Sequence, residues 1–172
     1  MNIRQATEQD IDGIIKVVSL AFNEEQYLQG QKVVEATLVS ELVNDSDDTV
    51  NLVADDSEIV GHVLISPVSL EPDVQLICGQ VSPLSVHPEH QSRGIGSSLM
   101  RAVIDESRAK GLDVLFLLGE PNYYHRFGFV TSRVDNVYGI SRHFQEFEIN
   151  AGSIPSKQTY AHLAPAFSRL GI

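Results

Sequence analysis

Residues 91–96 have the types and spacing to bind a phosphate group. They read Gln91-Ser92-Arg93-Gly94-Ile95-Gly96 and lie between an apolar, strand-like run and an amphipathic, helix-like run. Backbone N–H groups at the start of a helix point at one position, and the helix dipole places partial positive charge there. Gly94 and Gly96 have no Cβ, so the backbone can approach an anion closely. The segment predicts a site for phosphate or pyrophosphate.

The side chains of this loop extend that interpretation, and a plainer one stays open. Gln91 and Arg93 offer further donors, and Arg93 adds positive charge. A simple strand-to-helix turn is the alternative, because short glycine patterns also occur by chance. The chain has no G-x-x-x-x-G-K-[ST] sequence, and S-S-L follows Gly96, so the third glycine of G-x-G-x-x-G is missing. A P-loop or Rossmann nucleotide site is therefore disfavoured.

Two motifs of the chain resemble those of the GCN5-related N-acetyltransferases, the GNAT superfamily. Residues 86–96 resemble its Q/R-x-x-G-x-G/A loop after a strand, and Y-H-R-F-G-F at 124–129 resembles its Y-x-K/R-x-G-F segment. Two motifs in the family's order are more specific than either alone. The resemblance extends from the N-terminus to about Val130, and residues 118–124 look similar to bacterial predicted acetyltransferases of the YhbS type.

The resemblance implies a fold. It is an α/β fold, with α+β character, whose central mixed sheet has about six to seven strands and is flanked by about four helices. The sheet is expected to splay between its fourth and fifth strands, and the gap to admit the pantetheine arm of acetyl-CoA. Residues 1–172 are expected to form a single N-acetyltransferase (GNAT) domain.

The resemblance also implies a reaction: transfer of an acetyl group from acetyl-CoA to a primary amine by direct attack in a ternary complex. The backbone around Ser85 would pair with the pantetheine arm, and an N–H there would stabilise the developing oxyanion. Tyr124, at the family's acid position, would protonate the departing thiolate. Two alternatives stay open: Tyr123 is the acid instead, or both tyrosines only pack a short helix. The residues assigned to coenzyme A are Leu84, Ser85, Val86, Gln91, Ser92, Arg93, Gly94, Ile95, Gly96 and Ser97.

No general base is assigned from the sequence. The candidates are Glu24, Glu25, His62 and Glu120. The alternatives are a solvated loop carboxylate for each glutamate and a hydrogen-bonded strand imidazole for the histidine. His87 is expected to cap a strand end, and its H-x-x-H pair with His90 has no second ligand cluster, so no metal site is predicted.

Composition and charge narrow the function classes. The 172 residues are 42% hydrophobic, enough for a domain with its own core. The single cysteine, Cys78, excludes an internal disulfide and is expected to be a core thiol, which fits a reducing cytoplasm. The N-terminus has no signal peptide pattern, and no apolar run approaches the length of a membrane span, so neither export nor a membrane is expected.

The net charge of −11 disfavours nucleic acid as a partner. An acidic surface would steer cationic amines towards the protein; the alternative is that the charge serves only solubility. A homodimer stays open. The alternative functions are a non-catalytic acyl-CoA sensor that regulates a partner, and an interaction domain that kept the fold and lost the cofactor. The intact glycine loop argues against the second.

The rest of the sequence predicts the elements that must position these residues. Thr7 is a plausible N-cap, and Gly111 a plausible C-terminal glycine. The unbroken apolar run 114–118 predicts a central parallel strand, so strand, loop, helix and strand form a right-handed βαβ unit. Residues 130–147 are expected to hold one strand plus irregular structure, and residues 160–170 a closing strand. Other strands are expected over 3–6, 49–54, 58–68 and 75–86, and helices over 8–22, 33–43 and 97–110.

Overall fold

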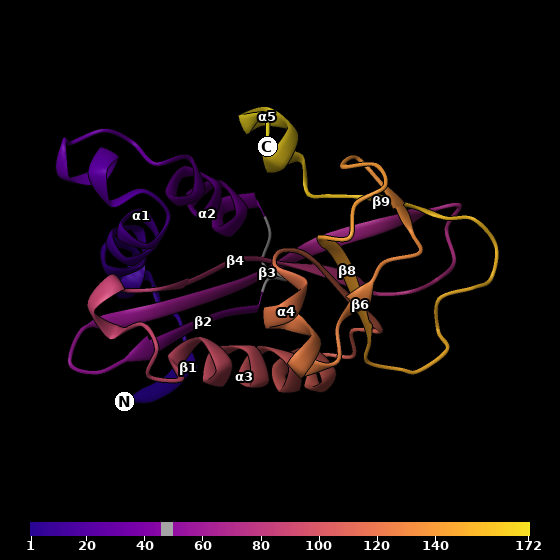
Figure 1. Cartoon of the computed structure of the whole chain (residues 1–172), viewed down its shortest axis with the longest axis horizontal. Coiled ribbons are helices and arrows are strands. Elements are labelled where there is room, and N and C mark those ends of the chain that lie inside the picture. Colours follow the sequence, from indigo (N-terminus) through magenta and orange to yellow (C-terminus); the bar gives the residue numbers. More distant parts are fainter. Residues whose placement is uncertain (46–49) are drawn as a thin grey trace.

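The computed structural model describes residues 1–45 and 50–172 as a central sheet with helices on both faces (Figure 1). The strands are β1 (Asn2–Gln5), β2 (Val50–Asp55), β3 (Ile59–Glu71), β4 (Cys78–Val86), β5 (Val114–Leu118), β6 (Val130–Thr131), β7 (Asp135–Asn136), β8 (Phe144–Glu148) and β9 (Tyr160–His162). The helices are α1 (Ile11–Leu28), α2 (Val34–Asp45), α3 (Ile95–Ala109), α4 (Pro121–Tyr124) and α5 (Pro165–Leu170).

The sheet is mixed, as predicted. Its main path is β1-β2-β3-β4-β5-β8-β6; off this path, the short strand β9 pairs with β3, and β7 pairs with β9. Neighbours on the main path are antiparallel except β4 and β5, which are parallel. The described pairing of β4 with β5 ends at Gln80 and Phe116, although β4 continues to Val86. Beyond Gln80, the edge of β4 that faces β5 therefore has its backbone groups free of the ladder.

Two hydrophobic layers hold the helices to the sheet. Helix α3 packs on one face through Leu99, Met100 and Val103, all fully buried. Helices α1, α2 and α5 cover the other face, as Figure 1 shows, with Ile14 and Leu38 at their contact. Burial of each such side chain contributes about 1.5–3 kcal/mol, so both layers fix α3 and the loop before it relative to β4.

The first helix differs from the prediction at both ends. Residues 8–10 form a 3₁₀ turn, in which Asp10 accepts the Thr7 N–H at 2.7 Å and binds Arg4 at 2.7 Å. Helix α1 then continues past Phe22 to Leu28, with non-helical backbone at Asn23. The Asn23 Oδ1 accepts the Gln26 N–H at 3.1 Å, so it caps a second helical segment.

The starts of two strands also differ from the predicted ones. The fourth strand begins at Cys78 rather than residue 75, because Gln75 has φ 59° and its N–H binds Asp73 Oδ1 at 2.8 Å in a turn. The second strand begins at Val50, and the predicted start at Thr49 lies outside the described residues.

The prediction for the C-terminal third of the chain is the least accurate. Residues 130–147 hold three short strands rather than one. The expected strand over 160–170 is wrong beyond His162, because Pro165 starts helix α5 and buries Ala166 and Phe167. Proline suits the first helical position, and that apolar spacing fits one helical face. In the parts of the chain that the structure describes, no helix has both the length and the apolar character needed to cross a membrane.

Candidate active site

The predicted phosphate loop opens helix α3. The helix begins at Ile95, two residues before the predicted start, because Gly94 is its N-cap in the left-handed conformation at φ 83°. Glycine adopts this conformation without the steric cost that other residues have. The loop is placed by strand β4, which ends at Val86, and by a 3₁₀ turn over Pro88–His90.

The start of α3 presents backbone donors. The Ser98 N–H donates to Gly94 C=O at 3.0 Å and makes the first hydrogen bond of the helix. The N–H groups before it have no acceptor within the helix, and the helix dipole adds partial positive charge at the same place. The arrangement suits an anion such as a phosphate.

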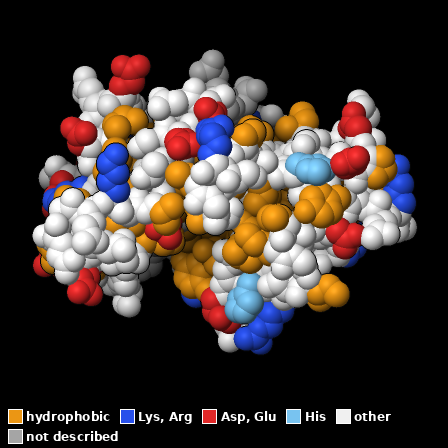
Figure 2. Space-filling model, turned by 90° about the horizontal axis from the view of Figure 1, so that it is seen from above, with side chains coloured by type: hydrophobic (Ala, Val, Ile, Leu, Met, Phe, Trp, Pro, Cys, Tyr) orange, Lys and Arg blue, Asp and Glu red, His pale blue; other side chains and the backbone are white. Residues whose placement is uncertain are grey.

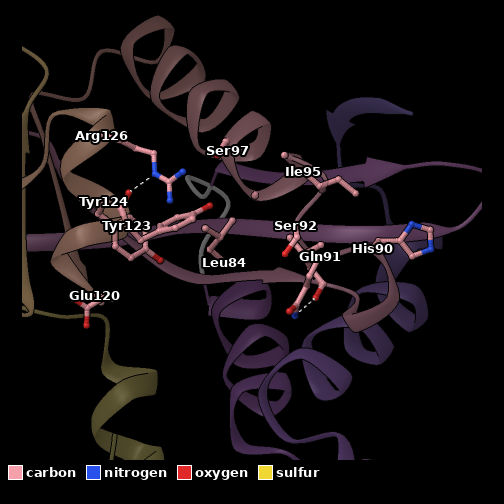
Figure 3. A pocket seen from close by; sticks show the side chains of 14 residues that line it. Leu84, His90, Gln91, Ser92, Ile95, Ser97, Glu120, Tyr123, Tyr124 and Arg126 are labelled. Carbon is pink, nitrogen blue, oxygen red and sulfur yellow. Dashed lines mark hydrogen bonds between the residues drawn. The ribbon is translucent and has the colours of Figure 1, made fainter.

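This helix start borders a cleft of about 720 Å³ between α3, the end of β4 and α4 (Figure 3). From above, the surface of the molecule is hollowed near its centre, and hydrophobic side chains lie in the hollow (Figure 2). The residues that line the cleft are Leu84, Val86, His90, Gln91, Ser92, Gly94, Ile95, Gly96, Ser97, Gly119, Glu120, Tyr123, Tyr124 and Arg126. A cleft of this size is typical for a small molecule or cofactor.

The structure brings most of the predicted residues to this cleft. Two of them, Ser85 and Arg93, are not among its lining residues. Side chains alternate along a strand, so Ser85 points away from the cleft and is buried opposite His62, its partner on β3. Arg93 is exposed on the loop. Only the backbone of Ser85 is thus available for the contact that the sequence assigned to it.

The Gln91 side chain braces the loop. Its Nε2 donates to Val86 C=O at 3.1 Å, shown as a dashed line in Figure 3. The amide therefore ties the loop to the last residue of β4. The side chain predicted as an anion donor holds the loop's shape in this structure.

Tyr124 comes from the single-turn helix α4 and lies largely buried. Its ring meets the Tyr123 ring edge to face at a centroid distance of 4.9 Å. Burial, with a smaller effect of Tyr123, raises the pKa of the Tyr124 phenol to about 12. The phenol therefore keeps its proton at neutral pH and faces the cleft as a neutral donor.

Arg126 lines the cleft, although no role was predicted for it beyond its place in the second motif. Its guanidinium lies over the Tyr123 ring, 4.3 Å from the centroid, and its Nε donates to Tyr123 C=O at 2.8 Å. These contacts hold a positive charge beside the cleft. The arginine of Y-x-R-x-G-F was the signal that could have identified it.

The four base candidates lie in different places. His62 is fully buried, and its Nε2 is 2.8 Å from Asn51 Oδ1. Burial lowers the pKa of His62 to about 3, so the imidazole is neutral and away from solvent. Glu24 and Glu25 are exposed on α1 just beyond its kink. Glu120 is exposed and is the candidate that lines the cleft.

Cys78 and His87 are not among the residues that line the cleft. Cys78 is buried, and burial raises the pKa of its thiol to about 12, as expected for an unreactive core cysteine. His87 Nδ1 accepts the Glu89 N–H at 3.3 Å and caps the 3₁₀ turn that follows the strand.

Comparison with known proteins gives a family. The model of the acetyltransferase (GNAT) domain matches residues 2–131. The chain is 32% identical to the Escherichia coli "Uncharacterized N-acetyltransferase YjhQ" over 60% of each chain. It is 35% identical to the E. coli "Uncharacterized N-acetyltransferase YhbS" over 55% of this chain and 58% of that one. These matches span about three fifths of the curated relatives' length.

Solved structures extend the likeness over nearly the whole chain. E. coli YhbS, crystallised in complex with CoA, superposes with a TM-score of 0.86 at 25% identity over 99% of this chain and 93% of that one. A GNAT family acetyltransferase from Brucella melitensis, in complex with acetyl-CoA, gives a TM-score of 0.77 at 28% identity over 96% of this chain and 97% of that one. The C-terminal residues outside the family model thus also follow a known fold.

Proposed function

The chain belongs to the GNAT acetyltransferase domain family, and on that premise we propose that it is an acetyl-CoA-dependent N-acetyltransferase. Its acceptor is a primary amine, on a small molecule or at a protein N-terminus or lysine. One observation carries the proposal: the start of α3, the free edge of β4 and Tyr124 border the same cleft. We also propose that residues 1–172 act as a single domain.

The residues present fit acetyl-CoA. A Cβ on Gly94 would meet nothing within 4 Å, so the backbone donors there open on free space. Those donors suit the pyrophosphate. The free edge of β4 beyond Gln80 offers N–H and C=O groups to the amides of the pantetheine arm, as an added strand would find them. When bound, acetyl-CoA supplies an acetyl group activated as a thioester.

The chain's own residues have three tasks in this reaction. A backbone N–H on the free edge of β4, near Leu84, stabilises negative charge on the carbonyl oxygen. Tyr124, whose raised pKa of about 12 keeps its hydroxyl protonated at neutral pH, gives that proton to the departing sulfur. Glu120 lines the cleft and is exposed, so its carboxylate gives the amine's proton a path to solvent.

Calorimetric titration of the folded protein with acetyl-CoA, CoA and 3′-dephospho-CoA tests the cofactor. Saturable binding of acetyl-CoA supports the proposal and leads to a screen of amines by thiol release. A folded protein that binds none of the three overturns it. Saturable binding without turnover of any amine would instead favour an acyl-CoA sensor.

We propose a reducing, cytoplasmic location on the chemistry of Cys78. With one cysteine in its sequence, the chain can form no internal disulfide, so its fold does not depend on an oxidising compartment.

A further inference from the structure

Gly119 lies between strand β5 and helix α4, and both its N–H and its C=O are hydrogen-bonded to residues at or just before strand β8. Its N–H donates to His143 C=O at 2.9 Å. Its C=O accepts two hydrogen bonds, from Gln145 Nε2 at 3.0 Å and from His143 Nδ1 at 3.2 Å. Gln145 lies on β8 and is only 1% exposed. The position of Gly119 is thus set by strand β8.

The ring of Tyr124 rests on Gly119. A Cβ on Gly119 would clash with Tyr124 Cε2, and it would lie 3.0 Å from Cδ2 and 3.2 Å from Cζ. The ring therefore occupies the space that any larger residue would need. On its other sides lie Tyr123, at a centroid distance of 4.9 Å, and Phe129, at 6.2 Å. Gly119 is the backbone surface against which the phenol is oriented.

Helix α4 cannot orient Tyr124 by itself. It has four residues, and a single turn is not stable without its neighbours. The Tyr124 N–H donates to Glu120 C=O at a long 3.3 Å. The direction of the phenol consequently depends on the packing of its ring, and that packing depends on Gly119.

We propose that Gln145 is a positioning residue for the acetyl transfer: by holding Gly119 from strand β8, it fixes the direction in which Tyr124 presents its hydroxyl to the cleft. The inference rests on the proposed function, in which that hydroxyl protonates the departing sulfur. Gln145 carries this role because it is buried and its amide reaches Gly119 directly. Misplacement of a reacting group by about 1 Å can cost on the order of a hundredfold in rate.

Two variants test the connection at its two ends. Gln145→Leu keeps similar bulk and removes the donor to Gly119. Gly119→Ala pushes the Tyr124 ring directly. Ser107→Ala is the matched control, because it removes a buried hydroxyl whose hydrogen bond, to Val103 C=O at 2.7 Å, stays within α3. Urea unfolding shows which variants are folded.

Both test variants are expected to lower kcat by about tenfold, within the range for misplaced groups, while the Kd for CoA changes by less than about twofold. Added to Tyr124→Phe, Gln145→Leu is expected to lower kcat no further, because its effect passes through the phenol. Ser107→Ala should leave kcat unchanged. Wild-type kcat in a folded Gln145→Leu variant, or a loss that persists in the Tyr124→Phe background, would overturn the proposal.

NMR of protein labelled with ¹³Cζ-tyrosine provides a readout that needs no turnover. The Tyr124 signal is identified by its loss in Tyr124→Phe. In Gln145→Leu it is expected to shift and broaden, while the signals of Tyr27 and Tyr160 stay in place. An unmoved Tyr124 signal overturns the positioning role. If Tyr124→Phe keeps wild-type kcat, the acid role in the proposed function fails, and the spectrum still decides whether Gln145 orients the ring. If Gln145→Leu does not fold, Gly119→Ala is judged by the same measurements.

Discussion

The Tyr123 hydroxyl lies where a side chain on Gly96 would begin. A Cβ on Gly96 would be 2.6 Å from that oxygen, closer than real Cβ contacts allow. The first turn of α3 and the helix α4 therefore approach each other across one end of the cleft, and the absence of a side chain at Gly96 permits it. Gly94, two residues earlier, is different: it needs its left-handed φ of 83° but has open space around it.

Gly96→Ala is expected to weaken CoA binding by about tenfold, because the new methyl group displaces Tyr123 at the end of the cleft where the backbone N–H groups of α3 lie. Adding Tyr123→Phe removes the oxygen that clashes and should restore much of the affinity. Calorimetric titration with CoA measures both variants. An unchanged Kd for Gly96→Ala, or no recovery in the double variant, would contradict this account of the contact.

Gly94→Ala is the companion variant. It places a residue with a side chain in the left-handed region, which costs about 1–2 kcal/mol. We expect a lower free energy of unfolding in urea, and no rescue of that loss by Tyr123→Phe, since no side chain is in the way. Rescue would mean that a steric clash, rather than backbone strain, explains this glycine.

Tyr124→Phe removes the proposed acid and keeps the ring that packs on Gly119. Since general acid catalysis typically contributes at least about a hundredfold, kcat should fall by that order while the Kd for CoA is unchanged. Steady-state thiol release and calorimetry give the two numbers. Tyr160→Phe, at an exposed tyrosine outside the cleft, is the control and should retain wild-type kcat. A Tyr124→Phe enzyme with normal kcat removes Tyr124 from the mechanism.

Gln91→Glu tests the loop brace with nearly the same shape. The substitution replaces the amide that donates to Val86 C=O with a carboxylate, which repels that oxygen and adds negative charge beside the phosphate site. CoA binding should weaken by at least about tenfold at low salt, and by less at high salt as the charge is screened. Equal affinities for Gln91→Glu and the wild type would show that the loop keeps its shape without this hydrogen bond.

His62 makes the fold sensitive to acid. Its folded-state pKa of about 3 is below the ordinary value of about 6.5, so the unfolded chain binds the proton more readily. The free energy of unfolding is therefore unaffected by His62 protonation above about pH 6.5. It falls as the pH drops from there towards 3, with a slope of up to about 1.4 kcal/mol per pH unit. His62→Gln keeps a donor for Asn51 and should flatten the dependence of the unfolding free energy on pH in that window. His125→Gln, at an exposed histidine, is the control. A slope that survives in His62→Gln would assign the acid sensitivity to other groups.

The sequence was sufficient for the parts of the fold that local patterns specify. The apolar run Val114–Leu118 predicted β5 with both of its ends correct, because a strand covered on both faces leaves little ambiguity. The glycine loop and the helix after it were predicted as one unit, and the start was misplaced by two residues because Gly94 takes the N-cap position. Asn23, which restarts α1, gave too weak a signal for the kink to be expected.

What the sequence determined by itself was the loop around Gly94, whose residues have the chemistry to bind a phosphate; its resemblance to a family added the phenol of Tyr124 as the candidate proton donor. Only the tertiary structure decided which of them meet. Strand alternation turned the Ser85 side chain away from the cleft, and burial made His62 a neutral core group. The contact of Tyr124 with Gly119 is local, but the hydrogen bond from Gln145 to Gly119 joins positions 26 residues apart. No periodicity or spacing encodes that hydrogen bond, because it depends on how strand β8 pairs with β5.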